Sequence, residues 1–272
     1  MPKGKTESSP YKVQVLDRSL SILDALANAR EDASLAELAE KVKLHKSTVH
    51  RLTSILERHR IVERDSRSGR YRLGLRLFEL GSIAIGRFNI RDRAHPHLEK
   101  LLYEVDETVH LCALDAGEVL YLDKMEPVRS VRMASRIGRR NPAHCTSVGK
   151  AIMAFLPEPE TDDILRQHGL KRLTANTITT PAALKADLKV IRDRGYSIDN
   201  EENEEGVRCI GAAVLDHSGR PIAAISVSAP SFRLPMDKVP AVATAVCRAA
   251  TALSQESGYQ PRAATARKKV SM

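Results

Sequence analysis

This chain of 272 amino acids contains four cysteines, which could act as nucleophiles or as soft metal ligands. Cys112, Cys145, Cys209 and Cys247 lie 33, 64 and 38 positions apart. This spacing contains no paired CxxC, as a zinc finger would need, and it is too sparse for a disulfide scaffold. We therefore expect reduced thiols, without a metal or another cofactor.

Two chemical uses of these cysteines stay open. In the first, Cys209 or Cys145 is a nucleophile, His144 or His110 is its base, and Asp199 orients the base. In the second, the same two histidines and two cysteines bind zinc. Neither use has a recognisable spacing motif in the sequence. A Cys209-dependent enzyme with a basic head that binds DNA or RNA is therefore one hypothesis for the chain.

Recognition of nucleic acid is a second kind of chemistry that the sequence indicates. A short run of basic and hydroxyl residues consists of Lys46, Ser47, Thr48, His50 and Arg51. Hydroxyls and the free N–H groups of a helix start suit phosphate oxygens, whereas Arg51 or His50 could reach base edges. For each residue alone, the solvated face of an ordinary helix remains the alternative.

The elements around this run predict a helix-turn-helix. Apolar spacing predicts a helix over 17–27, with Asp17 as its cap. Ser34 and Glu37 form a capping box that begins a short second helix. After a brief turn, a third helix is expected over 46–59, with its basic residues largely off the apolar stripe.

A wing is expected after the third helix. Short strands at 61–63 and 71–73 enclose a polar loop with a glycine for its turn. Arg67, Arg70 and Arg72 lie on or beside this loop, and we expect them to contact DNA as well.

The positive charge of the chain is concentrated at its two ends. Residues 1–95 hold 19 Lys and Arg against 12 Asp and Glu, residues 96–255 hold 20 against 21, and residues 256–272 hold 4 against 1. A basic N-terminal third on a neutral body is typical of a nucleic-acid-binding head joined to a separate sensing or catalytic domain. Ordinary solvated charge is the alternative.

The rest of the chain predicts a mostly antiparallel sheet flanked by helices. Helices are expected over 75–88, about 94–105, 147–155, 181–194 and after Pro235, and strands over 108–114, 118–125, 128–135, 196–200, 207–215 and 221–228. The polar segments 1–12 and 259–272 are expected to be disordered tails. No apolar stretch reaches the length of a spanning helix, so we expect a cytoplasmic protein without a membrane partner.

Several motifs resemble one known family in the right order. They are KSTVHRL at 46–52, YRLG at 71–74, RM at 132–133, HCTSVGKA at 144–151, RGYSID at 194–199, EE at 201–202, GVRCI at 206–210 and AISVSAP at 224–230. Together they resemble the IclR family of bacterial transcriptional regulators from about residue 13 to residue 258.

The resemblance implies an α+β fold in two parts and a function. It implies a winged helix-turn-helix domain over 13–74, a linker helix over 75–90 and a GAF-like effector-binding domain over 91–258. The expected function is a sequence-specific transcriptional regulator, most often a repressor, under the control of a small-molecule effector such as an organic acid. The expected partners are double-stranded DNA with a palindromic operator and further copies of the chain, as a homodimer or tetramer.

The resemblance also implies an effector pocket. The corresponding residues are Met133, Ser147, Val148, Asp199, Cys209, Ser226 and Ser228. N–H groups at a helix start favour an anion, and hydroxyls two positions apart on a strand point to the same side. Asp199 complicates a carboxylate ligand, so it should be protonated or bind a donor on the ligand; a buried structural role is the alternative. Cys209 is more often an inert core residue.

Overall fold

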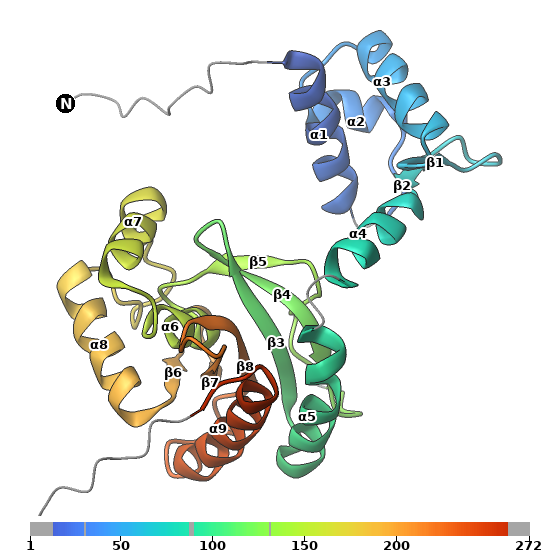
Figure 1. Ribbon diagram of the computed structural model, residues 1–272. Helices are drawn as coiled ribbons and strands as arrows, with labels where there is room; N and C mark the ends of the chain where they lie inside the picture. The colour runs from blue at the N-terminus through green and yellow to red at the C-terminus, as the bar shows by residue number, and fades with distance from the viewer. Residues whose placement is uncertain (1–12, 30, 87–89, 131, 261–272) are drawn as a thin grey trace, which may run out of the picture. The chain divides into compact units, whose positions relative to one another are not determined.

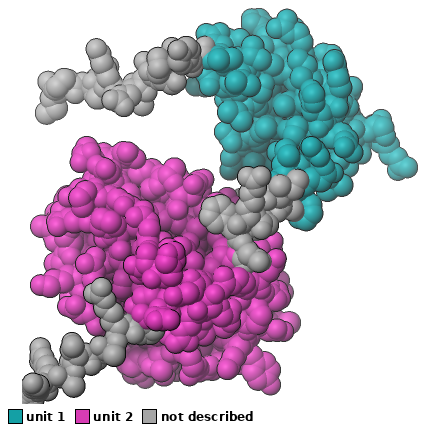
Figure 2. All heavy atoms as spheres, in the orientation of Figure 1, with its two compact units in different colours: residues 1–88 teal, residues 89–272 magenta. Residues whose placement is uncertain are grey.

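The fold is seen in a computed structural model, which describes residues 13–29, 31–86, 90–130 and 132–260. The chain divides into two compact units, residues 1–88 and 89–272, which Figure 2 shows in different colours. The expected tail 1–12 and residues 261–272 of the second tail lie outside the described residues.

The first unit contains a three-helix head, a hairpin and a further helix. Its elements are α1 (Gln14–Ala27), α2 (Leu35–Lys41), α3 (Lys46–Arg58), β1 (Val62–Arg64), β2 (Tyr71–Leu73) and α4 (Arg76–Gly86). The strands pair antiparallel, and Ile22, Leu38, Val49, Leu52 and Tyr71 lie in the core between the elements. This arrangement is the winged helix-turn-helix that the sequence predicts.

Of the caps predicted for the first two helices, one is confirmed and one is wrong. The capping box at α2 is confirmed, since Ser34 Oγ accepts from Glu37 N and Glu37 Oε2 accepts from Ser34 N. The expected cap at Asp17 is wrong: α1 begins three residues earlier, and Asp17 lies within its first turn. The added turn carries Val15, which is exposed and therefore contributes nothing to the buried stripe that predicted the helix.

The second unit is built on one six-stranded sheet. Its elements are α5 (Ile90–Val105), β3 (Thr108–Asp115), β4 (Glu118–Met125), β5 (Arg140–Pro142), α6 (Ser147–Met153), α7 (Glu158–His168), α8 (Pro181–Arg194), β6 (Ser197–Asn200), β7 (Val207–Leu215), β8 (Pro221–Pro230) and α9 (Val239–Glu256). The strand order is β5-β4-β3-β8-β7-β6, and all neighbours are antiparallel. The mostly antiparallel sheet expected from the sequence is thus present.

Helices cover both faces of this sheet (Figure 1). On one face, α5 and α9 pack against an apolar core that includes Leu98, Ile225 and Val246. On the other face, α6 packs on the sheet and is backed by α8, and their core includes Ile152 and Leu188. The polar side chains of interest lie on the α6 face.

Two parts of the second unit differ from the sequence prediction. The strand expected over 128–135 is wrong, because the described residues of that segment form no strand and the third strand lies at β5. The carbonyls of Met133 and Ser135 accept from Lys124 Nζ at 2.9 and 3.0 Å instead of from a neighbouring strand. Helix α7 was missed, since it contains few apolar residues and Thr161 is its single buried residue.

Candidate DNA-binding surface and effector site

The predicted DNA-contacting residues of α3 lie together at its start. Lys46, Ser47, His50 and Arg51 are exposed, and Thr48 is half-buried. The residue before the helix, His45, provides no side-chain cap, and its carbonyl accepts from Thr48 N and Val49 N. The first N–H groups of α3 therefore point out of the helix start, as a phosphate oxygen would require.

The three arginines of the wing differ in their surroundings. Arg67 is exposed at the tip of a loop in which Asp65 Oδ1 accepts from the N–H groups of Arg67 and Ser68. Arg70 instead donates to Glu37 Oε2 at 2.9 Å and to the Asp32 carbonyl at 2.5 Å. This arginine ties the wing to the start of α2.

Arg72 is likewise engaged within the head. Its Nε lies 3.2 Å from Glu63 Oε2, and its Nη1 lies 3.8 Å from Asp32 Oδ2. Sequence reasoning treated the three wing arginines alike, because ion pairs between segments distant in the chain leave no local pattern. Lys43 and His45, which were not among the predicted DNA contacts, are also exposed in the turn before α3.

The register of the sheet brings four of the predicted effector residues together. Asp199 pairs with Cys209 across β6 and β7, and Cys209 pairs with Ser228 across β7 and β8. The neighbouring row of the same face joins Gly211 to Ser226. These side chains therefore lie side by side on the face that α6 covers.

The start of α6 is pressed closely onto these rows. Ser147, whose carbonyl accepts from Ser197 Oγ at 2.5 Å, lies above Gly211. A Cβ atom at Gly211 would come within 2.9 Å of the Ser147 carbonyl carbon, so glycine is required for this approach. Thr146 caps the helix by accepting from Gly149 N. The N–H groups of Ser147 and Val148 lie in the first turn, where the helix itself provides no carbonyl to accept from them.

Asp199 is a candidate effector-binding residue that also stabilises the local structure. Its Oδ1 accepts from Glu202 N at 2.8 Å and from Asn203 N at 3.3 Å, which shapes the turn after β6. Burial raises the pKa of Asp199 to about 7, against the lowering effect of these hydrogen bonds and of Lys150. The carboxyl group is thus partly protonated near neutral pH, which is one of the states that the sequence left open.

Met133 lies apart from the regular elements of the site. It belongs to the segment after β4 and is half-buried, with its carbonyl held by Lys124 Nζ. This hydrogen bond involves only the backbone of Met133. That its side chain contacts the effector remains a prediction.

His110 lies beside the candidate effector residues, a position that the sequence did not predict. The sequence offered it as a base or a zinc ligand, whereas it lies on β3 opposite Ser226. Its ring is edge-on to Tyr121 at 5.0 Å between centroids, and the Tyr121 hydroxyl accepts from Asn141 Nδ2 at 3.3 Å. Only the register between distant strands reveals this neighbourhood.

The surroundings of the cysteines oppose a reactive thiolate. Burial raises the pKa of Cys209 and Cys112 well above the ordinary value, and raises that of Cys145 to about 12. A nucleophilic or zinc-binding cysteine needs the opposite shift. Among the described residues, no group of three or more His, Cys, Asp and Glu side chains is arranged to bind a metal ion.

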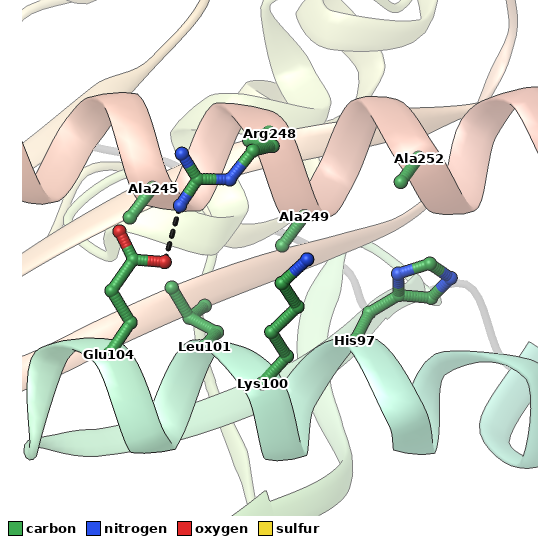
Figure 3. Close-up of a pocket in the computed structure, with 8 residues that line it drawn as sticks. All are labelled: His97, Lys100, Leu101, Glu104, Ala245, Arg248, Ala249 and Ala252. Atoms are coloured by element: carbon green, nitrogen blue, oxygen red, sulfur yellow. Dashed lines mark hydrogen bonds and ion pairs between the residues drawn. The ribbon is translucent and has the colours of Figure 1, made fainter.

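A separate hollow lies on the opposite face of the sheet, between α5 and α9 (Figure 3). Leu101, Ala245 and Ala249 line it, and an ion pair between Glu104 and Arg248 closes one end. Its cavity volume is about 50 Å³, whereas pockets for small molecules usually measure roughly 300 to 1,000 Å³. This hollow is therefore too small for an effector.

The head and the second unit together define a DNA-binding transcriptional regulator with a separate sheet domain. Residues 15–66 match the family model of the IclR helix-turn-helix domain, and residues 83–255 match that of the bacterial transcriptional regulator IclR C-terminal domain. The chain belongs to the IclR family of bacterial transcriptional regulators, as the motifs suggested.

Known relatives are similar over nearly the whole chain. The chain is 34% identical over 251 residues to the transcriptional repressor IclR of Escherichia coli strain K12, with 92% of each chain covered. Thermotoga maritima IclR has a similar crystal structure, with a TM-score of 0.77 and 38% identity over 91% of this chain and 100% of that one.

A third relative was crystallised with a ligand. It is an IclR homologue from Microbacterium hydrocarbonoxydans in complex with 4-hydroxybenzoate, with a TM-score of 0.78 and 27% identity over 89% of this chain and 98% of that one.

In the part of our chain that the structure describes, none of the helices has the length and apolar character needed to cross a bilayer.

Proposed function

We propose that this regulator is a repressor that binds a palindromic operator and responds to a small carboxylate effector. The observation that carries the proposal is the buried cluster of Ser226, Ser228 and Asp199 beside the start of α6. The two hydroxyls and the N–H groups of Ser147 and Val148 can donate to a carboxylate. A protonated Asp199 would not repel it. The carboxylate in the Microbacterium complex supports this ligand class.

In the proposed DNA complex, α3 enters the major groove and the wing lies on the backbone. Arg51 and His50 read base edges, while Lys46, Ser47 and Thr48 bind phosphates. Arg67 is the wing residue best placed to reach DNA. Arg70 and Arg72 contribute through the wing's position, since their guanidinium groups are engaged by carboxylates of the head.

We further propose a homodimer, with a tetramer of two dimers as its larger form. A palindrome requires two heads, and α1 and the segment after β2 expose apolar side chains that a second copy could cover. They include Val13, which directly precedes α1, and Val15, Leu16, Leu20, Leu75 and Phe78. In this arrangement 13–74 is the DNA-binding domain, 75–90 the linker and 91–258 the effector domain. A regulator bound to the chromosome acts in the cytoplasm.

The alternative is an enzyme that uses Cys209 as its nucleophile. The raised pKa of this thiol and its position between Asp199 and Ser228 favour a packing role instead. We therefore propose that the chain acts without catalysing a reaction. Rapid, pH-dependent alkylation of Cys209, together with the loss of a catalysed reaction, would support the enzyme hypothesis.

The experiment that tests the proposal is selection of genomic DNA fragments by the purified chain at about 0.15 M salt, followed by sequencing. Enrichment of palindromic sites, bound roughly a thousandfold or more tightly than random DNA, is expected. Arg51→Ala should weaken binding to the enriched sites by about 1 to 3 kcal/mol and relax their sequence at the position that Arg51 reads. Uniform retention of all fragments by the wild type would overturn sequence-specific regulation.

A further inference from the structure

His110 is a buried polar residue that the proposed function does not use. It lies on β3, with its backbone opposite Ser226 of β8 and Lys124 of β4. The residue is 1% exposed. Its position at the centre of the sheet places it on the same face as the proposed effector residues.

Both ring nitrogens of His110 have polar neighbours. Nδ1 lies 3.4 Å from Ser226 Oγ and 3.5 Å from Ser228 Oγ, so one nitrogen faces both hydroxyls that we assign to the effector. Nε2 lies 2.7 Å from Ser135 Oγ on the other side of the ring. The imidazole and the two serines therefore form one hydrogen-bonding cluster.

The imidazole is uncharged in this cluster. Burial, and secondarily the nearby ammonium of Lys124, lower the pKa of His110 to about 3. A neutral imidazole has one donor and one acceptor, and each serine hydroxyl can donate or accept. The cluster thus offers hydrogen bonds to a ligand without supplying a positive charge.

The geometry of the cluster restricts the ligand. When Nε2 of His110 donates to Ser135, Nδ1 is an acceptor, and a carboxylate that accepts from Ser226 and Ser228 would take the hydroxyl protons available to it. An acid with only an alkyl group near Nδ1 would leave this buried nitrogen without a partner, which is costly. A hydroxyl group supplies the missing hydrogen bond.

We propose that His110 is a further effector-binding residue, and that it selects acids with a hydroxyl group beside the carboxylate. The inference rests on the proposed function, because it requires the carboxylate to bind at Ser226 and Ser228. The inference adds to the proposed function a further residue, His110, and the ligand group that this residue recognises.

The test is calorimetric titration of the full chain with three matched pairs of acids: acetate and glycolate, propionate and lactate, and succinate and malate. The wild type should bind at least one hydroxy acid about tenfold more tightly than its partner. His110→Leu should lose this preference by weakening the hydroxy acid about tenfold, while the affinity for the partner changes less than about threefold.

Two further variants keep the test decisive if His110→Leu does not fold. His110→Asn places an amide near the position of Nδ1 and should retain the preference, whereas His110→Gln moves the amide away and should lose it. Ser135→Ala is the matched control, since it removes only the partner of Nε2 and should retain the preference. Thermal unfolding verifies that each variant is folded.

The outcomes separate this inference from the proposed function. A hydroxyl preference that survives in His110→Leu or His110→Gln overturns the role of His110, and so does a wild type that binds none of the six acids or prefers the partners. If acids bind but the double variant Ser226→Ala, Ser228→Ala binds them equally well, the proposed effector site itself is wrong.

Discussion

The ammonium group of Lys150 on α6 lies 2.5 Å from Glu202 Oε1, in the interior of the second unit. The two side chains are 1% and 8% exposed, and Lys150 Nζ also lies 2.9 Å from Asp187 Oδ2 on α8. Glu202 in turn donates its N–H to Asp199. Lys150 therefore joins α6, α8 and the turn that carries the candidate effector residue.

Removal of the Lys150 charge should destabilise the second unit strongly. Lys150→Met leaves the buried carboxylate of Glu202 without its counter-ion, which typically costs about 3 to 5 kcal/mol of the free energy of unfolding. Urea denaturation measures the loss. Lys185→Met is the control, because Lys185 pairs with Glu158 and Asp162 at the surface, where pairs contribute about 1 kcal/mol or less. Equal losses in the two variants would contradict the structural role of Lys150.

Asp199 should make stability depend on pH between about 4 and 7. Its pKa is raised in the folded chain to about 7, chiefly by burial, so the folded state holds a proton that the unfolded state has released. The contribution of Asp199 is therefore fully present below the pKa of the unfolded chain and is lost as the pH rises to about 7.

The measurement is the difference in the free energy of unfolding between the wild type and Asp199→Asn at several pH values. The wild type should lose up to about 1.4 kcal/mol per pH unit relative to the variant within this window. The asparagine still accepts from Glu202 N and Asn203 N, so the turn is retained. A difference that is constant with pH would show that Asp199 stays ionised.

Arg67 and Arg70 should differ in their effects on DNA binding. Arg67→Ala removes an exposed cation at the wing tip, so affinity should fall about equally for all sequences, and the slope of log affinity against log salt should decrease by about 1. Arg70→Ala breaks the contacts with Glu37 and Asp32 and should chiefly lower the thermal stability of the head. A reduced salt slope in Arg70→Ala alone would reverse this assignment.

Gly211→Ala should destabilise the second unit by about 1 to 3 kcal/mol. The added methyl group meets the backbone of Ser147, which can yield only if α6 shifts away from the sheet. Chemical denaturation measures the effect. Gly81→Ala in α4 is the matched control, since among the described residues nothing beyond the backbone of the helix itself lies within 4 Å of the added group. Alanine there should favour the helix by about 0.5 to 1 kcal/mol. Destabilisation of similar size in both variants would indicate a general intolerance of alanine.

The amino-acid sequence by itself determined the elements whose signals are local. The capping box of Ser34 and Glu37 begins α2, and Thr180 and Gly195 bound α8, because each signal acts within one or two turns of its own helix. The motifs in both halves identified the family, and with it the candidate residues of α3 and of the effector site.

The tertiary structure decided what depends on segments far apart in the chain. Only the register of β3, β7 and β8 places His110 against Ser226 and Ser228, and only packing of the wing on α2 occupies Arg70. The expected strand at 128–135 failed for the same reason, since Lys124 of a neighbouring element captures its carbonyls. Periodicity reports which face of a segment is apolar, whereas the partner of that face is chosen by packing and hydrogen bonding across the whole unit.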